Sequence, residues 1–151
     1  MSLPRRLSAV TLGTADLPRL RSFYSAGLGW EEVAGSDDNW VAYVAGGVVL
    51  SLFPSEELAA ESGVDQGQSG AGSSRGDMFT LGCNVESAAK VDEVYRAWLA
   101  AGAQVGAEPE DRSWGGRSGY VLDPDGNAWE IAWAPGIVFG ERGEIVGFGG
   151  A

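Results

Sequence analysis

Residues 119–133 read GYVLDPDGNAWEIAW, and this segment is the strongest structural signal in the chain. Two β-prone runs flank Asp123-Pro-Asp-Gly126, in which proline presets φ and glycine tolerates a positive φ, so these four residues predict a tight hairpin turn. The same device stands earlier in the chain, where residues 40–43 and 48–53 flank Gly46-Gly47. A hairpin that occurs twice predicts a repeated unit.

The segment before each hairpin is repeated as well. Residues 10–33 read VTLGTADLPRLRSFYSAGLGWEEV, and residues 79–105 read FTLGCNVESAAKVDEVYRAWLAAGAQV. Each predicts a strand, a polar cap, an amphipathic helix that ends at glycine, and a second strand. The sequence therefore predicts an α+β protein with two βαβββ modules, at 7–54 and 78–135, within one structural domain.

Both helices carry local signals. Asp16 and Ser87 are suitable N-caps, and Pro18 is tolerated in a first helical turn. Apolar residues follow the helical period in both, at Leu17, Leu20, Phe23 and Tyr24 in the first helix and at Val91, Val94, Tyr95, Trp98 and Leu99 in the second. These stripes, together with Trp129, are expected to form the core.

The remaining segments connect or extend the modules. Residues 55–77 are expected to be a linker, with a short helix near 54–61 and then a loop rich in Gly and Ser. A lid over a binding cleft is the alternative for that loop. The tail, 136–151, has a turn signal at residues 141–143 and could form a small hairpin or cover a partner subunit.

Composition excludes several classes of function. The chain has 151 residues and a net charge of −11, with Lys90 as its one lysine, which argues against nucleic acid. The acidity suits either solubility or a cationic ligand. No apolar run is long enough to span a membrane and no secretory signal is visible, so a cytoplasmic protein is expected. The chain has no histidine, the commonest metal ligand and acid–base group.

The duplicated pattern, with residues 16–30 (DLPRLRSFYSAGLGW) and 119–133, resembles the glyoxalase/bleomycin-resistance/dioxygenase (vicinal oxygen chelate) superfamily. The resemblance covers about residues 7–135. It implies an eight-stranded incomplete barrel around a cleft, and it implies a homodimer, because many two-module members build their clefts with a partner subunit. Whether the modules pair within a chain or between chains cannot be read from the spacing.

Metal-using members of that family place ligands on the first and fourth strands of each module. Carried onto this sequence, the first-module positions fall at Ala9 and Ser51, and those of the second module at Thr80 or Met78 and at Glu130. Glu130 alone has a ligand-type side chain, and one carboxylate does not hold a divalent ion tightly. The resemblance therefore implies neither a metal nor another cofactor.

The candidate site residues lie on segments expected to line the cleft. Glu130 should point opposite to Trp129, Ile131 and Trp133, because strand side chains alternate. Glu130 is the candidate proton-transfer residue. The alternatives are that its carboxylate pairs with an arginine such as Arg117 or is simply solvated. The candidate ligand-binding residues, which could stack on a planar compound, attract a cation or meet an anionic group, are Trp40, Tyr43, Trp114, Arg117 and Tyr120. Cys83 is expected to be inert.

Three functions remain. The first is a metal-free protein that binds an apolar, planar or cationic small molecule, in the manner of the bleomycin-resistance branch. The second is a metal-independent isomerase or lyase that uses Glu130, helped by Tyr120, Tyr43 or Arg117. The third, a metal-dependent glyoxalase or dioxygenase, would need ligands that this sequence does not display.

Overall fold

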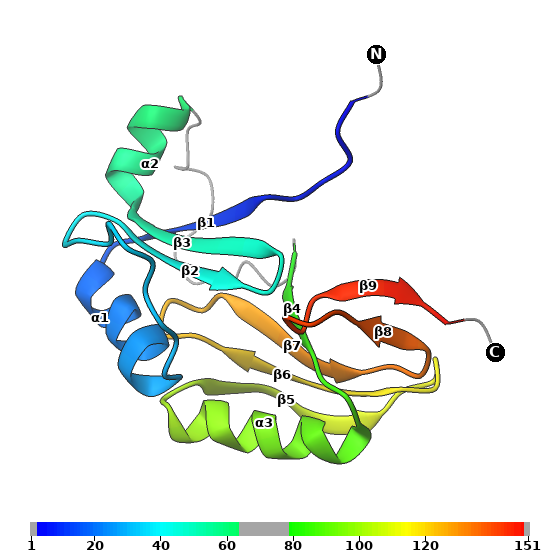
Figure 1. Ribbon diagram of the computed structural model, residues 1–151. Helices are drawn as coiled ribbons and strands as arrows, with labels where there is room; N and C mark the ends of the chain where they lie inside the picture. Colours follow the sequence, from blue (N-terminus) through cyan, green and yellow to red (C-terminus); the bar gives the residue numbers. More distant parts are fainter. Residues whose placement is uncertain (1–2, 64–78, 150–151) are drawn as a thin grey trace.

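The computed structural model describes residues 3–63 and 79–149 (Figure 1). The first module forms a three-stranded sheet of order β1-β3-β2, with β1 parallel and β2 antiparallel to β3. Its elements are β1 (Ala9–Thr14), α1 (Leu17–Ser22), η1 (Phe23–Gly27), β2 (Val41–Ala45) and β3 (Val48–Pro54).

The second module repeats this topology with one more strand. Its sheet has the order β4-β7-β6-β5, with β4 parallel to β7 and the other pairs antiparallel. Its elements are β4 (Leu81–Asn84), α3 (Ala88–Ala100), β5 (Gln104–Asp111), β6 (Arg117–Leu122) and β7 (Ala128–Trp133). The α+β class and the two repeated modules predicted from the sequence are therefore confirmed.

The strand expected after Gly29 is missing from the first module. A single bridge between Glu32 and Tyr43 stands where the second module has β5. Here the Glu32 side chain contacts the first helix instead: it accepts two hydrogen bonds from Arg21, at 2.8 and 2.7 Å, and one from the Ser25 hydroxyl at 2.6 Å. The expected eight-stranded barrel thus has seven strands and a bridge.

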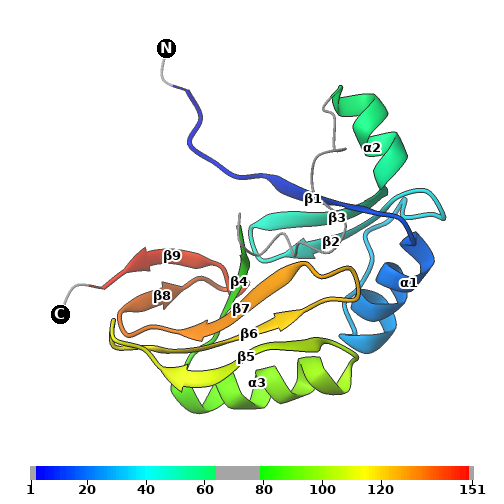
Figure 2. The ribbon, with the colours of Figure 1, turned by 180° about the vertical axis from the view of Figure 1, so that it is seen from behind.

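Two further elements lie outside the repeat. Helix α2 (Ser55–Ser62) follows β3 directly, where a short helix is expected. The expected Gly/Ser-rich loop lies outside the described residues apart from its first two. At the other end of the chain β8 (Ile137–Phe139) and β9 (Ile145–Phe148) form an antiparallel hairpin, seen from behind in Figure 2. None of the described helices is both long and apolar enough to cross a membrane.

The helix signals are confirmed in detail. The Asp16 and Ser87 side chains accept hydrogen bonds from the backbone N–H groups of Arg19 and Lys90, three residues on in each case. Helix α1 continues into a π-helical turn, η1, in which the N–H of Leu28 donates to the carbonyl of Phe23 at 2.9 Å. This wider turn carries Ser25, which contacts Glu32 and Tyr43.

Both modules contribute their helix-covered faces to one core. The Phe23 ring of the first helix lies 6.0 Å from Trp98 of α3, and the Trp30 ring lies 5.8 Å from Trp129 of β7. Burying six linked aromatic rings in one cluster removes much apolar area from water and makes the two modules a single folding unit. The cluster consists of Phe23, Tyr24, Trp30, Tyr43, Trp98 and Trp129.

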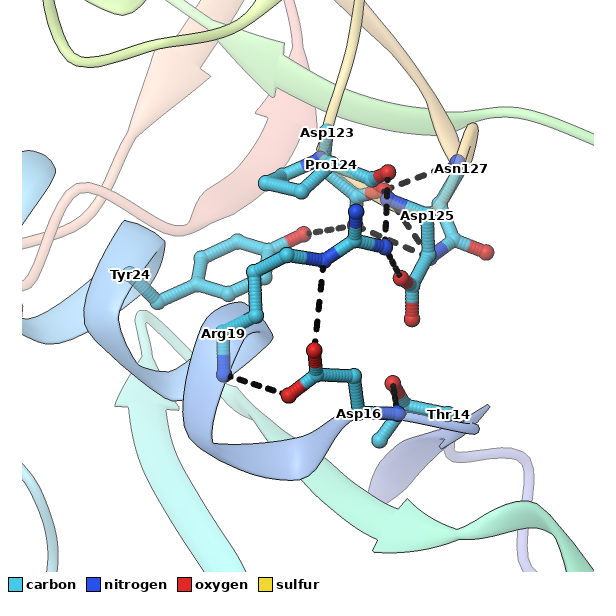
Figure 3. Close-up of polar contacts among 8 residues, drawn as sticks. All are labelled: Thr14, Asp16, Arg19, Tyr24, Asp123, Pro124, Asp125 and Asn127. Atoms are coloured by element: carbon cyan, nitrogen blue, oxygen red, sulfur yellow. Dashed lines mark hydrogen bonds and ion pairs between the residues drawn. The ribbon is translucent and has the colours of Figure 1, made fainter.

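A buried polar contact joins the first helix to the second hairpin (Figure 3). The Tyr24 hydroxyl donates to Asp123 Oδ2 at 2.7 Å and accepts from the Trp129 indole N–H at 3.0 Å. Asp123, which is 1% exposed, also accepts from the backbone N–H groups of Asp125 and Asn127 and from the Asn127 amide. Burial raises the pKa of Asp123 despite these hydrogen bonds. The Asp-Pro-Asp-Gly turn is therefore a structural clamp between the modules.

We predict that Tyr24→Phe lowers the free energy of unfolding by roughly 1–3 kcal/mol, because it leaves a buried carboxylate and a buried indole N–H without this partner. Urea denaturation measures the loss. Tyr95→Phe is the matched control, since the Tyr95 hydroxyl is buried and has no hydrogen-bond partner in the described structure. Tyr95→Phe should therefore be neutral or stabilising, and equal losses in the two variants would contradict the clamp.

A second prediction concerns pH. Hydrogen bonds from Arg21 and then from Ser25 lower the pKa of Glu32 from 4.5 to about 2. Because the folded-state pKa lies below the unfolded one, the stabilisation is fully present above pH 4.5 and is lost as the pH falls towards 2. Glu32→Gln should cost roughly 1–2 kcal/mol near neutral pH and much less at the acid end of that window.

Denaturant titrations at several pH values measure this difference. Glu31→Gln is the matched control, because Glu31 is exposed and no ion pair to it is found among the described residues. If the loss of unfolding free energy caused by Glu32→Gln did not become smaller between pH 4.5 and 2, the lowered pKa of Glu32 would be contradicted.

Candidate functional site

The strand register identifies equivalent positions in the two modules. Ser51 of β3 stands between Thr11 of β1 and Ala42 of β2. Glu130 of β7 stands likewise between Gly82 of β4 and Tyr120 of β6. Thr11 and Ser51 of the first module therefore correspond to Gly82 and Glu130 of the second.

The register also shows which first-strand residues adjoin Ser51 and Glu130. The first-strand neighbour of Ser51 is Thr11, whose hydroxyl lies 2.6 Å from that of Ser51, whereas Ala9 pairs with Val49. The neighbour of Glu130 is Gly82, whereas Thr80 precedes β4, and Met78 lies outside the described residues. Because the period of a strand is two, Ala9 lies on the same face as Thr11, two residues earlier.

The residues at these four positions do not fit a metal ion. They provide two hydroxyl groups, a glycine and one carboxylate, whereas a zinc-type site takes three or four imidazole, thiolate or carboxylate ligands. Over residues 3–63 and 79–149, no three His, Cys, Asp or Glu side chains lie together as a metal-binding group.

Glu130 and Tyr120 lie side by side on the face of the second sheet that points away from α3. Their odd-numbered neighbours Val121, Trp129 and Ile131 are in the core, so the even-numbered positions point the other way. Both side chains are half-buried. Burial, followed by the neighbouring Glu130 carboxylate, raises the pKa of Tyr120, which therefore keeps its proton near neutral pH. We call this surface the Glu130 face.

Arg112 completes the Glu130 face. Its guanidinium lies 5.8 Å from the centre of the Tyr120 ring and donates to the Ser118 hydroxyl at 2.9 Å and to the Ser118 carbonyl at 3.1 Å. It also pairs with Glu110, which is exposed. Sequence reasoning missed Arg112, because it follows an irregular strand and no periodicity assigns it to a face. A half-buried carboxylate, phenol and guanidinium together can hold a polar aromatic molecule.

Arg117 lies on the opposite face. It donates to both carboxylate oxygens of Asp92 on α3, at 2.8 and 3.1 Å, and to Asp111 at 3.1 Å. Arg117 therefore joins a helix to its sheet and does not pair with Glu130. An Asp92–Arg117 pair is not visible in the sequence, since the two residues lie 25 positions apart.

The three other candidate aromatic residues lie apart from Tyr120. Tyr43 is 1% exposed in the core, with its hydroxyl 2.8 Å from Ser25. Trp40 is 36% exposed in the loop before β2, and Trp114 is 52% exposed in the loop before β6. Neither indole makes a ring contact with another described aromatic residue. One chain therefore does not assemble the expected aromatic cleft from these residues.

The two equivalent faces point away from each other within a chain. Their reverse sides share the core, so Thr11 and Ser51 cannot face Glu130 unless a second copy supplies one of the faces. Surface cavities of the described chain lie elsewhere. One, of about 610 Å³, is lined by residues 30–34 and 43–45, which include the candidate residue Tyr43. Another, of about 290 Å³, lies beside Arg21 and Glu32, and another, of about 580 Å³, lies between the modules.

Comparisons with known proteins show which family and which solved structures this chain is similar to. A family model described as Glyoxalase/Bleomycin resistance protein/Dioxygenase superfamily matches residues 6–131. A solved glyoxalase-related enzyme from Fulvimarina pelagi is 31% identical, with a TM-score of 0.83 over 97% of this chain and 100% of that one.

More distant solved structures support the fold alone. A glyoxalase/bleomycin resistance protein/dioxygenase from Nocardioides is 21% identical, with a TM-score of 0.73 over 99% of this chain and 93% of that one. A lactoylglutathione lyase from Agrobacterium tumefaciens is 22% identical, with a TM-score of 0.63 over 88% of this chain and 96% of that one. A search of curated proteins finds no match. Because the family model spans most of the sequence, the chain belongs to the glyoxalase/bleomycin resistance protein/dioxygenase superfamily.

Proposed function

We propose that this protein binds a planar, cationic small molecule on the Glu130 face without a resident metal. The observation that carries the proposal is the set of residues at the four equivalent strand positions. Thr11, Ser51 and Gly82 stand where metal-using relatives need ligands, and Glu130 is left as the single carboxylate. A lone carboxylate beside an aromatic ring suits a charged organic ligand better than a metal ion.

The chemistry of the Glu130 face supports a planar cation. The charge of Arg112, which lies over the Tyr120 ring, is paired with Glu110, so the Glu130 carboxylate is the charge on this face that is left for a ligand cation. The net charge of −11 favours the approach of cations to the whole molecule. Gly82 leaves open space beside Glu130, because an added Cβ atom there would meet only Asn84 Oδ1, at 3.9 Å.

A second copy of the chain closes this site. In the proposed homodimer the Thr11–Ser51 face of one copy covers the Glu130 face of the other, so each of two clefts contains residues from both chains. The support is geometric: the two faces point apart in one chain because their reverse sides share the core. Face-to-face closure excludes water and strengthens the attraction between Glu130 and a cation.

We predict that Glu130→Gln weakens binding of N-methylquinolinium about tenfold, which corresponds to roughly 1.4 kcal/mol, and leaves binding of uncharged quinoline unchanged. Isothermal titration calorimetry at pH 8 measures both. The control is Glu57→Gln, which removes the same charge from the exposed side of α2. Equal losses of affinity in both variants would mean that the change in net charge, and not the position of Glu130, weakens binding. Stoichiometric Mn, Fe, Ni or Zn in the purified protein would contradict the metal-free proposal.

Mixing variants tests the shared cleft. Thr11→Arg and Glu130→Gln should each weaken N-methylquinolinium binding when alone, because a guanidinium at the exposed Thr11 position repels the cation. After the two variants are mixed and their subunits exchanged, heterodimers contain one doubly altered site and one unaltered site. Titration should therefore recover about one quarter of the wild-type sites, as mass action over randomly paired subunits requires. No recovery despite verified exchange would place the whole site within one chain.

A metal-independent isomerase or lyase is the second candidate function. The observation that favours it is the pairing of Tyr120 with Glu130, in which the protonated phenol can donate to a substrate oxygen while the carboxylate removes a proton. A pH–rate profile governed by one carboxylate and abolished in Glu130→Gln, with ligand still bound, would favour catalysis over sequestration.

A further inference from the structure

The cavity between the modules is distinct from the Glu130 face. It has a volume of about 580 Å³, within the range of small-molecule sites, and it lies where three segments meet. These segments are the β2–β3 turn, strand β4 and the β8–β9 turn. We call this cavity the junction cleft.

The floor of the junction cleft is aromatic. Trp30 and Trp129 both line it, with ring centres 5.8 Å apart and planes at 85° to each other. Cys83 adds a neutral, polarisable thiol, because burial raises its pKa. An indole face and an indole edge at right angles form a corner that fits a flat ring by stacking on one and edge contact with the other.

The walls of the junction cleft supply backbone groups. Strand β4 is the edge of its sheet among the described residues. Because the Val85 N–H points towards β7, where it donates to Ala132 at 2.8 Å, the alternating main-chain groups of Gly82 and Asn84 point to the free edge. The backbone N–H groups of Gly82 and Asn84 can therefore donate hydrogen bonds into the junction cleft, whereas the Asn84 side chain lies beside Gly82 on the Glu130 face.

The charge available at the rim is positive. Glu144 folds back on its own turn, where it accepts from the Arg142 backbone N–H at 2.9 Å. The Arg142 side chain is 70% exposed, and its contact with Glu144 is long, at 3.5 Å. Arg142 is therefore free to turn towards a bound anion, whereas Glu144 is already satisfied.

We infer that the junction cleft is a second small-molecule site, which takes a flat aromatic carboxylate. The ring lies in the Trp30–Trp129 corner, and the carboxylate meets Arg142 at the rim and the free backbone N–H groups of β4. The preferred charge is opposite to that proposed for the Glu130 face, so the two sites are distinguishable by probe. The net charge of −11 opposes the approach of anions to the whole molecule, so binding of the carboxylate depends on its local contacts with Arg142 and β4.

Nuclear magnetic resonance locates the site directly. The chain has six tryptophans, and each indole N–H gives a signal that can be assigned with Trp→Phe variants. Titration of 2-naphthoate should shift the Trp30 and Trp129 signals saturably and leave those of the exposed Trp40 and Trp114 in place. Shifts at Trp40 or Trp114 without Trp30 and Trp129 would overturn the inference, as would no saturable shift at all.

A charge series tests the role of Arg142. Arg142→Gln should weaken 2-naphthoate binding about threefold to fivefold and leave neutral 2-naphthalenemethanol unchanged, as expected for a solvent-exposed ion pair. The matched control is Arg96→Gln, which removes the same charge from the exposed side of α3. Equal weakening in both variants would overturn the anion preference, as would tighter binding of 2-naphthylmethylammonium than of 2-naphthoate when both are followed by the Trp30 and Trp129 signals. Binding of N-methylquinolinium at the Glu130 face is measured in a separate titration. Failure of one proposal therefore leaves the other testable.

Discussion

The buried hydrogen bond from Tyr24 to Asp123 ties the first module to the second. It is buried, it joins the first helix to the second hairpin, and its oxygen atoms take part in further hydrogen bonds with Trp129 and Asn127. A buried carboxylate is costly unless every lone pair finds a donor, so the turn, the helix and β7 have one compatible arrangement. The relative orientation of the modules follows from this constraint.

The orientation of the modules explains why the residues that stabilise the fold and the residues proposed to bind a ligand lie on different faces of the sheets. The helix-covered faces meet and form an aromatic core, so the opposite faces remain on the outside. Arg117 and Tyr43 belong to the inner side and hold elements together, whereas Tyr120, Glu130 and Arg112 belong to the outer side. A family fold does not fix a reaction, and here the outer residues carry the proposed function.

Local signals in the sequence predict most of the fold. Capping by Asp16 and Ser87, the helical stripes and the Asp-Pro-Asp-Gly turn act over three or four residues, so each is visible without tertiary structure. Residues 31–33 show the limit, because this β-prone run forms a single bridge while Glu32 pairs with Arg21 on the first helix. The Glu130 position was predictable by counting from a turn glycine.

The rest of the site depends on contacts between distant segments. Strand alternation gives two faces but does not say which one a helix covers, and this is why Tyr43 and Arg117 were candidates for ligand contact. Arg112 follows a strand with two irregularities, where counting fails. The junction cleft brings together residues near 30, 46, 83 and 143, and no sequence periodicity connects them.

Gly82 has a consequence for how this superfamily changes its chemistry. Its φ is not positive, and a side chain there would meet little, so a larger residue fits without rebuilding the strand. Thr11 is exposed and Ser51 touches it through a hydroxyl, and neither takes part in the clamp or the aromatic core. New side chains at Gly82 and Thr11 could therefore change the chemistry of this surface without disturbing the core, whereas Ser51 is 4% exposed, so a larger residue there would have to displace its neighbours.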